Sequence, residues 1–252
     1  MDRINVLILA GQREGVIDPL CREAGVEYKA LLPILGTSMI DYVTKALDAS
    51  QAAQPPYYVS GIDVKMLDGA FIQSPSGAGP ANSVVQAFEA GLKPPFLVTT
   101  CDHPLLSPEM VDTFVSESQV SGQDFTLGLA SKSVIAPAYP DVKRTYLKFK
   151  DVHVSGCNLF YIANDKGMEA IRFWQSAQND RKHPLKLARR VGLGMLFRYL
   201  FGGLTLETAF NTASGKLNIQ AKPVLLPFAE AAIDVDKPSD LELVTQILSA
   251  RS

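Results

Sequence analysis

A nearly continuous apolar run at residues 4–10 is the feature that most constrains the fold of this 252-residue chain. Such runs are typical of strands that are buried on both faces, as in a parallel sheet. Residues 95–100 form a second run of the same kind, and between the two runs Ile40, Val43 and Leu47 follow helical spacing. Strands that alternate with helices predict an α/β fold, with a mostly parallel sheet flanked by helices.

The same patterns place the remaining elements along the chain. Further strands are expected at residues 57–60, 125–130, 146–149, 152–162 and 219–226. Helices are expected to begin at Ser83 and Ser107 and to cover residues 165–178 and 238–248, with a helical insertion at residues 181–215. No internal repeat or linker divides the sequence, so we expect one domain over residues 1–252.

Composition argues against several classes of protein. The net charge of −2 gives no basic field that would attract a nucleic acid. The three cysteines have no Cys-x-x-Cys spacing, which indicates neither a disulfide framework nor a zinc site and fits a reducing compartment. No apolar run approaches the ~20 residues of a membrane-spanning helix, and no signal peptide is recognised, so we expect a cytoplasmic protein.

A loop that contains glycine follows the first predicted strand. Gly11 and Gly15 would let the backbone approach a phosphate, and Arg13 and Lys29 would bring positive charge to it. The loop has neither the Gly-x-Gly-x-x-Gly pattern nor the Gly-Lys-Ser/Thr sequence of other phosphate-binding loops. An ordinary surface loop and a solvated lysine are the alternatives to a phosphate site.

Carboxylates occur at two places where an α/β sheet can use them. Asp102 follows the second apolar run, and ligands of open α/β sheets bind beyond the carboxyl ends of the strands. A carboxylate there can hold Mg²⁺, which prefers oxygen ligands, or can cap the following turn. Near the other end of the chain, Asp234 and Asp236 would point to one face of an extended segment, and Asp240 would stabilise the start of the last helix.

The order of these motifs resembles the signature of the MobA-like NTP transferases. This family includes molybdenum-cofactor guanylyl- and cytidylyltransferases and sugar-phosphate nucleotidyltransferases. The matching segments are Leu9-Ala10-Gly11 with Arg13 and Gly15, Lys29 to Pro33, Gly36, Met39-Ile40, Asp102-His103-Pro104, and residues 236–241 with the pattern Asp-x-Pro-x-Asp-Leu. Gln12 stands where the family usually has a second glycine, and Tyr28 stands where it usually has a proline. The resemblance does not extend to residues 181–215.

The resemblance implies a Rossmann-like fold of the nucleotide-diphospho-sugar transferase type. The implied reaction moves a nucleoside monophosphate from an NTP to a phosphorylated small-molecule acceptor and releases pyrophosphate. Arg13, Lys29 and Asp102 would be catalytic, and Asp102 and Asp236 would hold Mg²⁺, with Asp234 as a candidate helper. The nucleotide would be bound by Leu9, Ala10, Gly11, Gly15, Gly79, Pro80, Asn82 and Ser83.

The acceptor side is defined by fewer residues. Asn158 interrupts an apolar strand, where asparagine is depleted, and the family has a similar segment that faces the acceptor. Arg144 and Lys148 would face either the acceptor phosphate or the solvent.

Two other functions compete with nucleotidyl transfer. The Asp-x-Asp at residues 234–236 could suggest a metal-dependent glycosyltransferase that uses a nucleotide-sugar. That class would carry its Asp-x-Asp after a central strand, where this chain has Asp102 followed by histidine and proline, so nucleotidyl transfer is favoured. The other alternative is a catalytically silent nucleotide-binding module.

Basic residues at 181–190 precede an apolar segment at 192–202. Three interpretations compete for this stretch. It could be an insertion that packs on the core, it could bind an anionic acceptor, or residues 181–202 could make a peripheral contact with a membrane surface.

Overall fold

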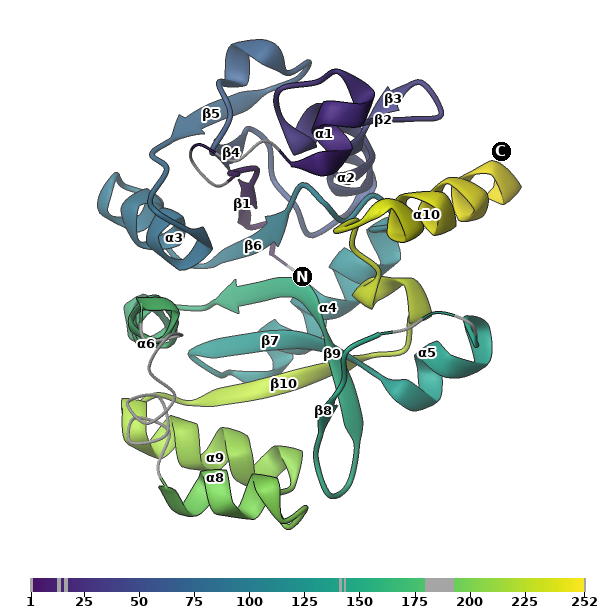
Figure 1. The fold of residues 1–252 in the computed structure, drawn as a ribbon. Coiled ribbons are helices and arrows are strands. Elements are labelled where there is room, and N and C mark those ends of the chain that lie inside the picture. The colour runs from purple at the N-terminus through teal and green to yellow at the C-terminus, as the bar shows by residue number, and fades with distance from the viewer. Residues whose placement is uncertain are drawn as a thin grey trace.

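The computed structural model of the chain describes residues 2–12, 15, 18–140, 142, 144–179 and 193–251. A mixed sheet runs through the middle of the molecule (Figure 1), with β5 toward the top and β10 toward the bottom of that view. Its strands are β1 (Asn5–Leu9), β4 (Tyr57–Ser60), β5 (Phe71–Ser74), β6 (Phe96–Thr100), β7 (Phe125–Ser131), β8 (Leu147–Lys148), β9 (His153–Ile162) and β10 (Ala221–Leu226). A separate hairpin pairs β2 (Pro33–Ile34) with β3 (Thr37–Ser38).

The strand order of the main sheet is β10-β7-β9-β6-β1-β4-β5, and β8 pairs with β9. β1 is parallel to β4 and β6, β4 is parallel to β5, and β10 is parallel to β7. The predicted mostly parallel sheet is therefore confirmed, with β9 as an antiparallel strand between β6 and β7. Val98 of β6 pairs with Phe160, so the first half of β9 reaches and passes the carboxyl end of β6.

Helices connect the strands and cover the sheet. They are α1 (Pro19–Ala24), α2 (Met39–Ala49), α3 (Pro80–Glu89), α4 (Pro108–Ser121), α5 (Lys132–Ala138), α6 (Met168–Asn179), α8 (Leu193–Leu200), α9 (Leu206–Leu217) and α10 (Pro238–Arg251). Short 3₁₀ helices are η1 (Lys29–Leu31), η2 (Val64–Met66), η3 (Asp165–Gly167) and η4 (Ala229–Ala232).

The two faces of β1 are buried in different clusters. Val6 packs in the cluster that contains the buried side chains of α2 and α4, whereas Leu7 packs in the cluster that contains those of α3 and α6. Successive side chains of a strand point to opposite faces of the sheet. A strand covered by helices on both faces needs apolar residues at nearly every position, which explains the continuous apolar run in the sequence.

Two predicted helix starts have different outcomes. The start at Ser107 is confirmed, because Ser107 Oγ accepts a hydrogen bond from the Met110 amide at 3.3 Å. The helix expected to open at Ser83 begins earlier, at Pro80, because proline suits the first helical turn.

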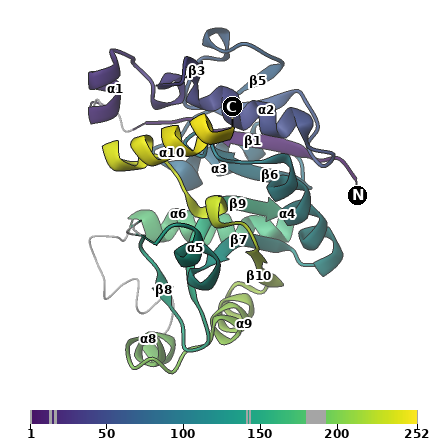
Figure 2. The ribbon, with the colours of Figure 1, turned by 90° about the vertical axis from the view of Figure 1, so that its right-hand side faces the viewer.

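The predicted helical insertion is described only from residue 193 onward. There, α8 and α9 lie together at the lower end of the molecule, below β10 (Figures 1 and 2). Residues 181–192 lie outside the described part of the chain. None of the described helices is long and apolar enough to cross a membrane.

Candidate active site

Lys29, Asp102 and Asp236 meet at the edge of the sheet where the parallel strands end. Lys29 Nζ lies 3.0 Å from Asp102 Oδ2 and 3.0 Å from Asp236 Oδ1, and donates a hydrogen bond to each. Lys29 opens η1, Asp102 follows β6, and Asp236 precedes α10. Three segments far apart in sequence thus place two carboxylates around one ammonium group.

The electrostatics of this cluster keep Lys29 charged. The side chains of Lys29 and Asp102 are only 16% and 20% exposed, whereas that of Asp236 is 67% exposed. Burial alone would lower the pKa of Lys29, but the charges and hydrogen bonds of Asp102 and Asp236 outweigh burial and raise the pKa above its ordinary value. Lys29 therefore stays positively charged at neutral pH, between the two carboxylates.

Asp102 has an unused acceptor. Its Oδ1 atom is buried and has no hydrogen-bond partner within the described part of the chain. A buried carboxylate oxygen without a partner is costly, so it favours binding of a further cation or hydrogen-bond donor.

Backbone and buried side-chain contacts position the two carboxylates. The amide of Val235 donates to the carbonyl of Asp102 at 2.9 Å, and the amide of Asp236 donates to Asp240 Oδ2 at 3.2 Å. On the other side of Asp102, the buried His103 ring places Nε2 3.1 Å from the carbonyl oxygen of Glu230 in η4. These contacts hold the loop after β6 against the segment before α10.

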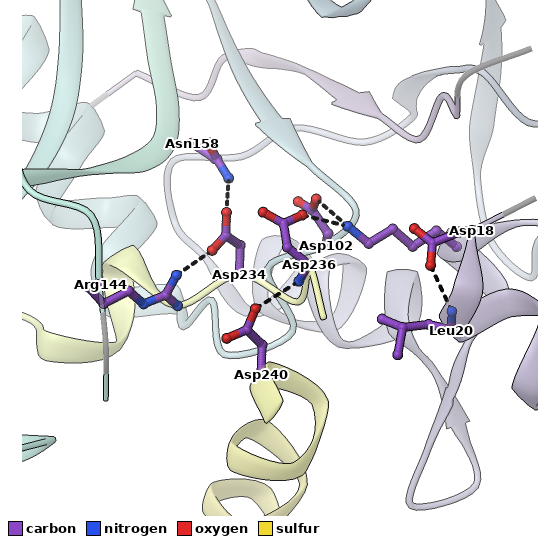
Figure 3. A network of polar contacts seen from close by, with 9 residues as sticks. Asp18, Leu20, Asp102, Arg144, Asn158, Asp234, Asp236 and Asp240 are labelled. Atoms are coloured by element: carbon purple, nitrogen blue, oxygen red, sulfur yellow. Dashed lines mark hydrogen bonds and ion pairs between the residues drawn. The ribbon is translucent and has the colours of Figure 1, made fainter. Parts of the chain in front are cut away.

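A second network lies beside the first. Figure 3 shows Asp234 between Arg144 and Asn158, next to Asp102 and Asp236. Asp234 Oδ1 is 2.7 Å from Arg144 Nη1, and its Oδ2 accepts a 3.4 Å hydrogen bond from Asn158 Nδ2. Asp234 thus contacts Arg144 and Asn158, the two residues predicted to bind the acceptor, while Asp236 contacts Lys29.

Arg144 is largely covered by the protein, so its interpretation as a solvent-exposed residue is wrong. Its side chain is 12% exposed and is held by the Asp234 carboxylate. Two of its donors, Nε and Nη2, are buried and have no partner among the described residues. Asn158 has a φ of 52°, a left-handed conformation that asparagine tolerates better than most residues. Lys148, by contrast, is exposed on β8.

The glycine loop after β1 packs closely on another strand end. Gly61 follows β4 with a φ of 94°, and a Cβ atom on it would overlap the backbone of Gly11. Ser76 Oγ lies 3.8 Å from the position that a Cβ of Gly11 would occupy. Two neighbouring loops thus surround Gly11, and the residues before it, Leu9 and Ala10, are buried. Gly15 has a φ of 72°, and a Cβ on it would meet none of the described residues within 4 Å, whereas Arg13 lies outside the described residues.

The loop before α3 is shaped by its own side chains. The buried Ser83 hydroxyl accepts from the Gly77 amide at 3.1 Å and donates to the Gly79 carbonyl at 3.3 Å. Asn82 Oδ1 accepts from Gln175 of α6 at 2.6 Å. Pro80 starts the helix, whose N-terminus is a favourable place for an anion. The described contacts of Asn82 and Ser83 fix the loop, and their contact with a nucleotide stays a prediction.

A magnesium site at these carboxylates stays a prediction. Within the described ranges, no group of three or more His, Cys, Asp and Glu side chains could hold a metal ion. Mg²⁺ does not need such a cage, since it is commonly bound by one or two carboxylates together with substrate phosphates and water. Asp102 and Asp236, which share one cation partner, are a donor set of this kind.

Sequence reasoning missed residues that support the site. Gly61 was detectable in principle, because a glycine directly after a parallel strand often marks close backbone approach. The contacts of His103 with Glu230 and of Gln175 with Asn82 leave no local sequence signal, since they join distant segments.

Solved structures with the same architecture come from several transferases. A hypothetical transferase from Thermus thermophilus is 28% identical, with a TM-score of 0.81, covering 95% of this chain and 99% of that one. CMP:2-keto-3-deoxy-manno-octonic acid synthetase complexed with CTP is 14% identical, with a TM-score of 0.60 and full coverage of both chains. Molybdopterin-guanine dinucleotide biosynthesis protein A from Archaeoglobus fulgidus is 15% identical, with a TM-score of 0.53, covering 98% of this chain and 100% of that one. No curated protein matches the chain.

The family match defines the class of the protein as an NTP transferase domain, and the solved structures share its α/β fold. The chain belongs to the MobA-like NTP transferase domain family, whose pattern matches residues 7–199. The family and fold expected from the motifs are thereby confirmed.

Proposed function

We propose that this protein transfers a nucleoside monophosphate from an NTP to a phosphorylated small-molecule acceptor and releases pyrophosphate. The observation that carries the proposal is the pair of carboxylates, Asp102 and Asp236, each 3.0 Å from Lys29 Nζ at the carboxyl edge of the sheet. Ligands of open α/β sheets bind at this edge. Membership of the MobA-like family supports the same reaction class.

In the proposed reaction, an oxygen of the acceptor phosphate attacks the α-phosphorus of the NTP. The bond from the α-phosphorus to the oxygen that bridges to the β-phosphorus breaks, and its electron pair leaves with pyrophosphate. No covalent enzyme intermediate is required, because positioning and electrostatic stabilisation supply most of the effect. Lys29 would balance the triphosphate charge, with Arg13 as a second cation.

Asp102 and Asp236 would hold Mg²⁺ against the phosphates. When bound, Mg²⁺ would supply positive charge that offsets the negative charge developing on the phosphates. The buried and unpartnered Oδ1 of Asp102 supports this role. Lys29 would exchange one of its carboxylate partners for a phosphate oxygen, which its flexible side chain allows.

The remaining NTP contacts are assigned to two loops. Gly11 and Gly15 would approach the phosphates, together with the backbone at Leu9 and Ala10. The segment that contains Gly79, Pro80, Asn82 and Ser83 would face the base and sugar. The packing of Gly61 and Ser76 around Gly11 supports a shared binding surface, because it brings the loops after β1 and β4 and the loop before α3 together.

The acceptor is proposed to be anionic. Arg144 keeps two buried donors without a described partner beside the Asp234 carboxylate. A guanidinium group with free donors is suited to a phosphate or carboxylate, which it binds through parallel hydrogen bonds. Asn158, on the adjoining β9, would add a neutral hydrogen bond to the acceptor.

Two measurements test this function. The first compares the thermal stabilisation of the protein by ATP, GTP, CTP and UTP with Mg²⁺, because a ligand that binds only the folded state raises its stability. CTP belongs in this set because the related synthetase was solved with it. The second measures pyrophosphate release with the selected NTP and a panel of phosphorylated small molecules. Release of a nucleoside diphosphate from a nucleotide-sugar would indicate a glycosyltransferase, and NTP binding without turnover would indicate a silent binding module.

A further inference from the structure

An exposed apolar surface lies on α8, at the lower end of the molecule. The side chains of Phe197, Leu200 and Phe201 are 56%, 67% and 84% exposed. Their spacing places them on one side of the helix and its final turn, where the Phe201 amide donates to the Phe197 carbonyl at 2.9 Å. The rings of Phe197 and Phe201 stack with centroids 6.3 Å apart. We call these three residues the α8 apolar face.

The α8 apolar face is held in place by contacts on another side of the helix. The Tyr199 ring packs edge-on against Phe149 with centroids 5.9 Å apart, and the Tyr199 hydroxyl accepts from the Lys148 amide at 3.3 Å. The turn after α8 is fixed by a 2.8 Å hydrogen bond from the Lys150 amide to the Leu204 carbonyl. The helix therefore presents its exposed side chains from a defined position against the β8–β9 turn.

Basic side chains outnumber acidic ones in the segments around the α8 apolar face. Residues 145–151 and 193–207 contain Lys148, Lys150 and Arg198 against Asp151 and Glu207, although the whole chain has a net charge of −2. Arg198 on α8, Lys148 on β8 and Lys150 after it are exposed. Arg198 thus follows Phe197 on the helix, and Lys148 and Lys150 lie on the segment that packs against Tyr199.

We propose that the α8 apolar face is a membrane-surface contact that binds an anionic lipid bilayer. Aromatic and aliphatic side chains on one side of a helix, bordered by Lys and Arg, are the composition of interfacial helices. The apolar side chains would enter the headgroup region, and Arg198, Lys148 and Lys150 would be attracted to anionic headgroups. The binding is peripheral and reversible, because a short helix buries little apolar area.

The surface fits a bilayer better than a second copy of the chain. A stable protein interface buries about 1,200 Å² or more with complementary charges, whereas this surface offers three apolar side chains beside cations that would repel those of a second copy. The proposal does not use the cations at residues 181–190, which lie outside the described residues. It is also independent of the proposed nucleotidyl transfer.

The test is co-sedimentation of the full chain with vesicles. The probes are phosphatidylcholine vesicles with about one third phosphatidylglycerol and, for comparison, pure phosphatidylcholine vesicles. We expect binding to the anionic vesicles at low salt and its loss at about 1 M salt, where the Debye length falls to about 3 Å. Phe197→Ser with Phe201→Ser should lower the partition coefficient about tenfold or more.

Matched variants distinguish binding through this surface from nonspecific adsorption of exposed apolar side chains. Val120 is 83% exposed on α4, so Val120→Ser removes an exposed apolar side chain elsewhere and should leave vesicle binding unchanged. Arg198→Gln with Lys148→Gln should weaken binding and flatten its salt dependence. All variants are compared by thermal unfolding, because exposed substitutions should leave the fold intact.

A second measurement keeps the proposal testable if a serine variant fails to fold. Brominated lipids should quench the fluorescence of Phe201→Trp in anionic vesicles, whereas Val120→Trp should be quenched no more than the native protein. The proposal is overturned if the native protein does not bind anionic vesicles at low salt, or if the double serine variant binds as well as the native protein. Concentration-dependent dimerisation through Phe197 and Phe201 without vesicle binding would also overturn it, and would assign the surface to a second copy.

Discussion

The carbonyl oxygen of Asp102 accepts a hydrogen bond from the amide of Val235 at 2.9 Å. This backbone contact joins the loop after β6 to the segment before α10 and sets the two carboxylates of the site side by side. Lys29 Nζ lies between Asp102 and Asp236. The contacts that position the backbone therefore also position the three charged side chains. Substitutions at these positions should therefore separate the chemistry from the fold.

Asp102→Asn should slow turnover by about 10²-fold or more while the protein folds normally. Asparagine keeps the size of the side chain but removes the charge that would hold Mg²⁺, and losing one electrostatic contact in a water-excluded site acts on this scale. The measurement is pyrophosphate release at saturating NTP, with Mg²⁺ titrated to high concentration. An exposed aspartate, Asp68, provides the control, and Asp68→Asn should be as active as the native protein.

Near-native turnover of the Asp102→Asn variant at ordinary Mg²⁺ would remove Asp102 from the mechanism. A purely turn-capping aspartate would give that result, because asparagine caps nearly as well as aspartate.

Lys29→Met should destabilise the protein in a pH-dependent way. The pKa of Lys29 is raised in the folded state, so its ion pairs contribute fully below its unfolded pKa of about 10.4, and the contribution is lost as pH rises through the higher folded-state pKa. At neutral pH the free energy of unfolding should fall by about 1–3 kcal/mol. This range is modest because solvent screens the ion pair with the largely exposed Asp236. Urea unfolding of both proteins from neutral pH to above pH 10 measures the difference, which should shrink at the alkaline end.

A constant difference over the whole pH range would assign the effect of Lys29→Met to lost side-chain packing. Comparing the two proteins at each pH cancels other groups that ionise in the same range, such as Tyr57 and Tyr139. The native fold raises the pKa of both tyrosines, through burial first and then through Asp48 and Glu230.

The sequence was most informative where local pattern and topology agree. The run at residues 4–10 became β1, and Asp102 was expected at a strand end because the run at 95–100 reads as a buried strand. In a parallel sheet all such ends lie at one edge, so the position of Asp102 beside the loop after β1 follows from the fold class, whereas Lys29 follows α1 and its position depended on the motif. The position of Asp236 depended on the motif, since no strand precedes it directly.

The remaining features depend on contacts between distant segments. The reversed direction of β9 has no local signature, because a buried strand has the same apolar pattern in either direction. The short helices α1 and α5 were not predicted, since α5 carries Pro137 and both are too brief for a helical period to stand out. The sequence suggested Arg144 as a polar residue on a strand, but it lies before β8 and pairs with Asp234, which is 90 positions away.

Arg144 and Asp234 should be energetically coupled. In a double-mutant cycle with Arg144→Gln and Asp234→Asn, we expect a coupling free energy of about 0.5–3 kcal/mol in urea unfolding, because each single change leaves a largely buried partner without its ion pair. The exposed pair Arg172 and Glu169 on α6 is the matched control, and its cycle should give less than about 0.5 kcal/mol. Equal coupling in the two cycles would contradict a specific role of burial at Arg144.

The last prediction concerns Gly61 and its matched position, Gly91. Both glycines have positive φ values, 94° and 112°, so alanine is strained at either position, by about 1–3 kcal/mol. They differ in their surroundings. A Cβ at Gly91 would meet nothing within 4 Å, whereas a Cβ at Gly61 would overlap the Cα and N atoms of Gly11. Gly91→Ala should therefore cost only the backbone strain, while Gly61→Ala must also displace the loop that carries Gly11.

Gly61→Ala should consequently unfold at lower urea than Gly91→Ala, and where it stays folded its NTP affinity should fall about tenfold or more, since a small displacement of backbone donors weakens phosphate binding. Isothermal titration with the preferred NTP and Mg²⁺, at a temperature where both variants are folded, measures this difference. Gly91→Ala should bind NTP as the native protein does. If the two variants lose equal stability and bind NTP equally well, then the close packing of Gly61 on Gly11 does not shape the nucleotide site, and the loop after β1 would have to be positioned by contacts other than those of β4.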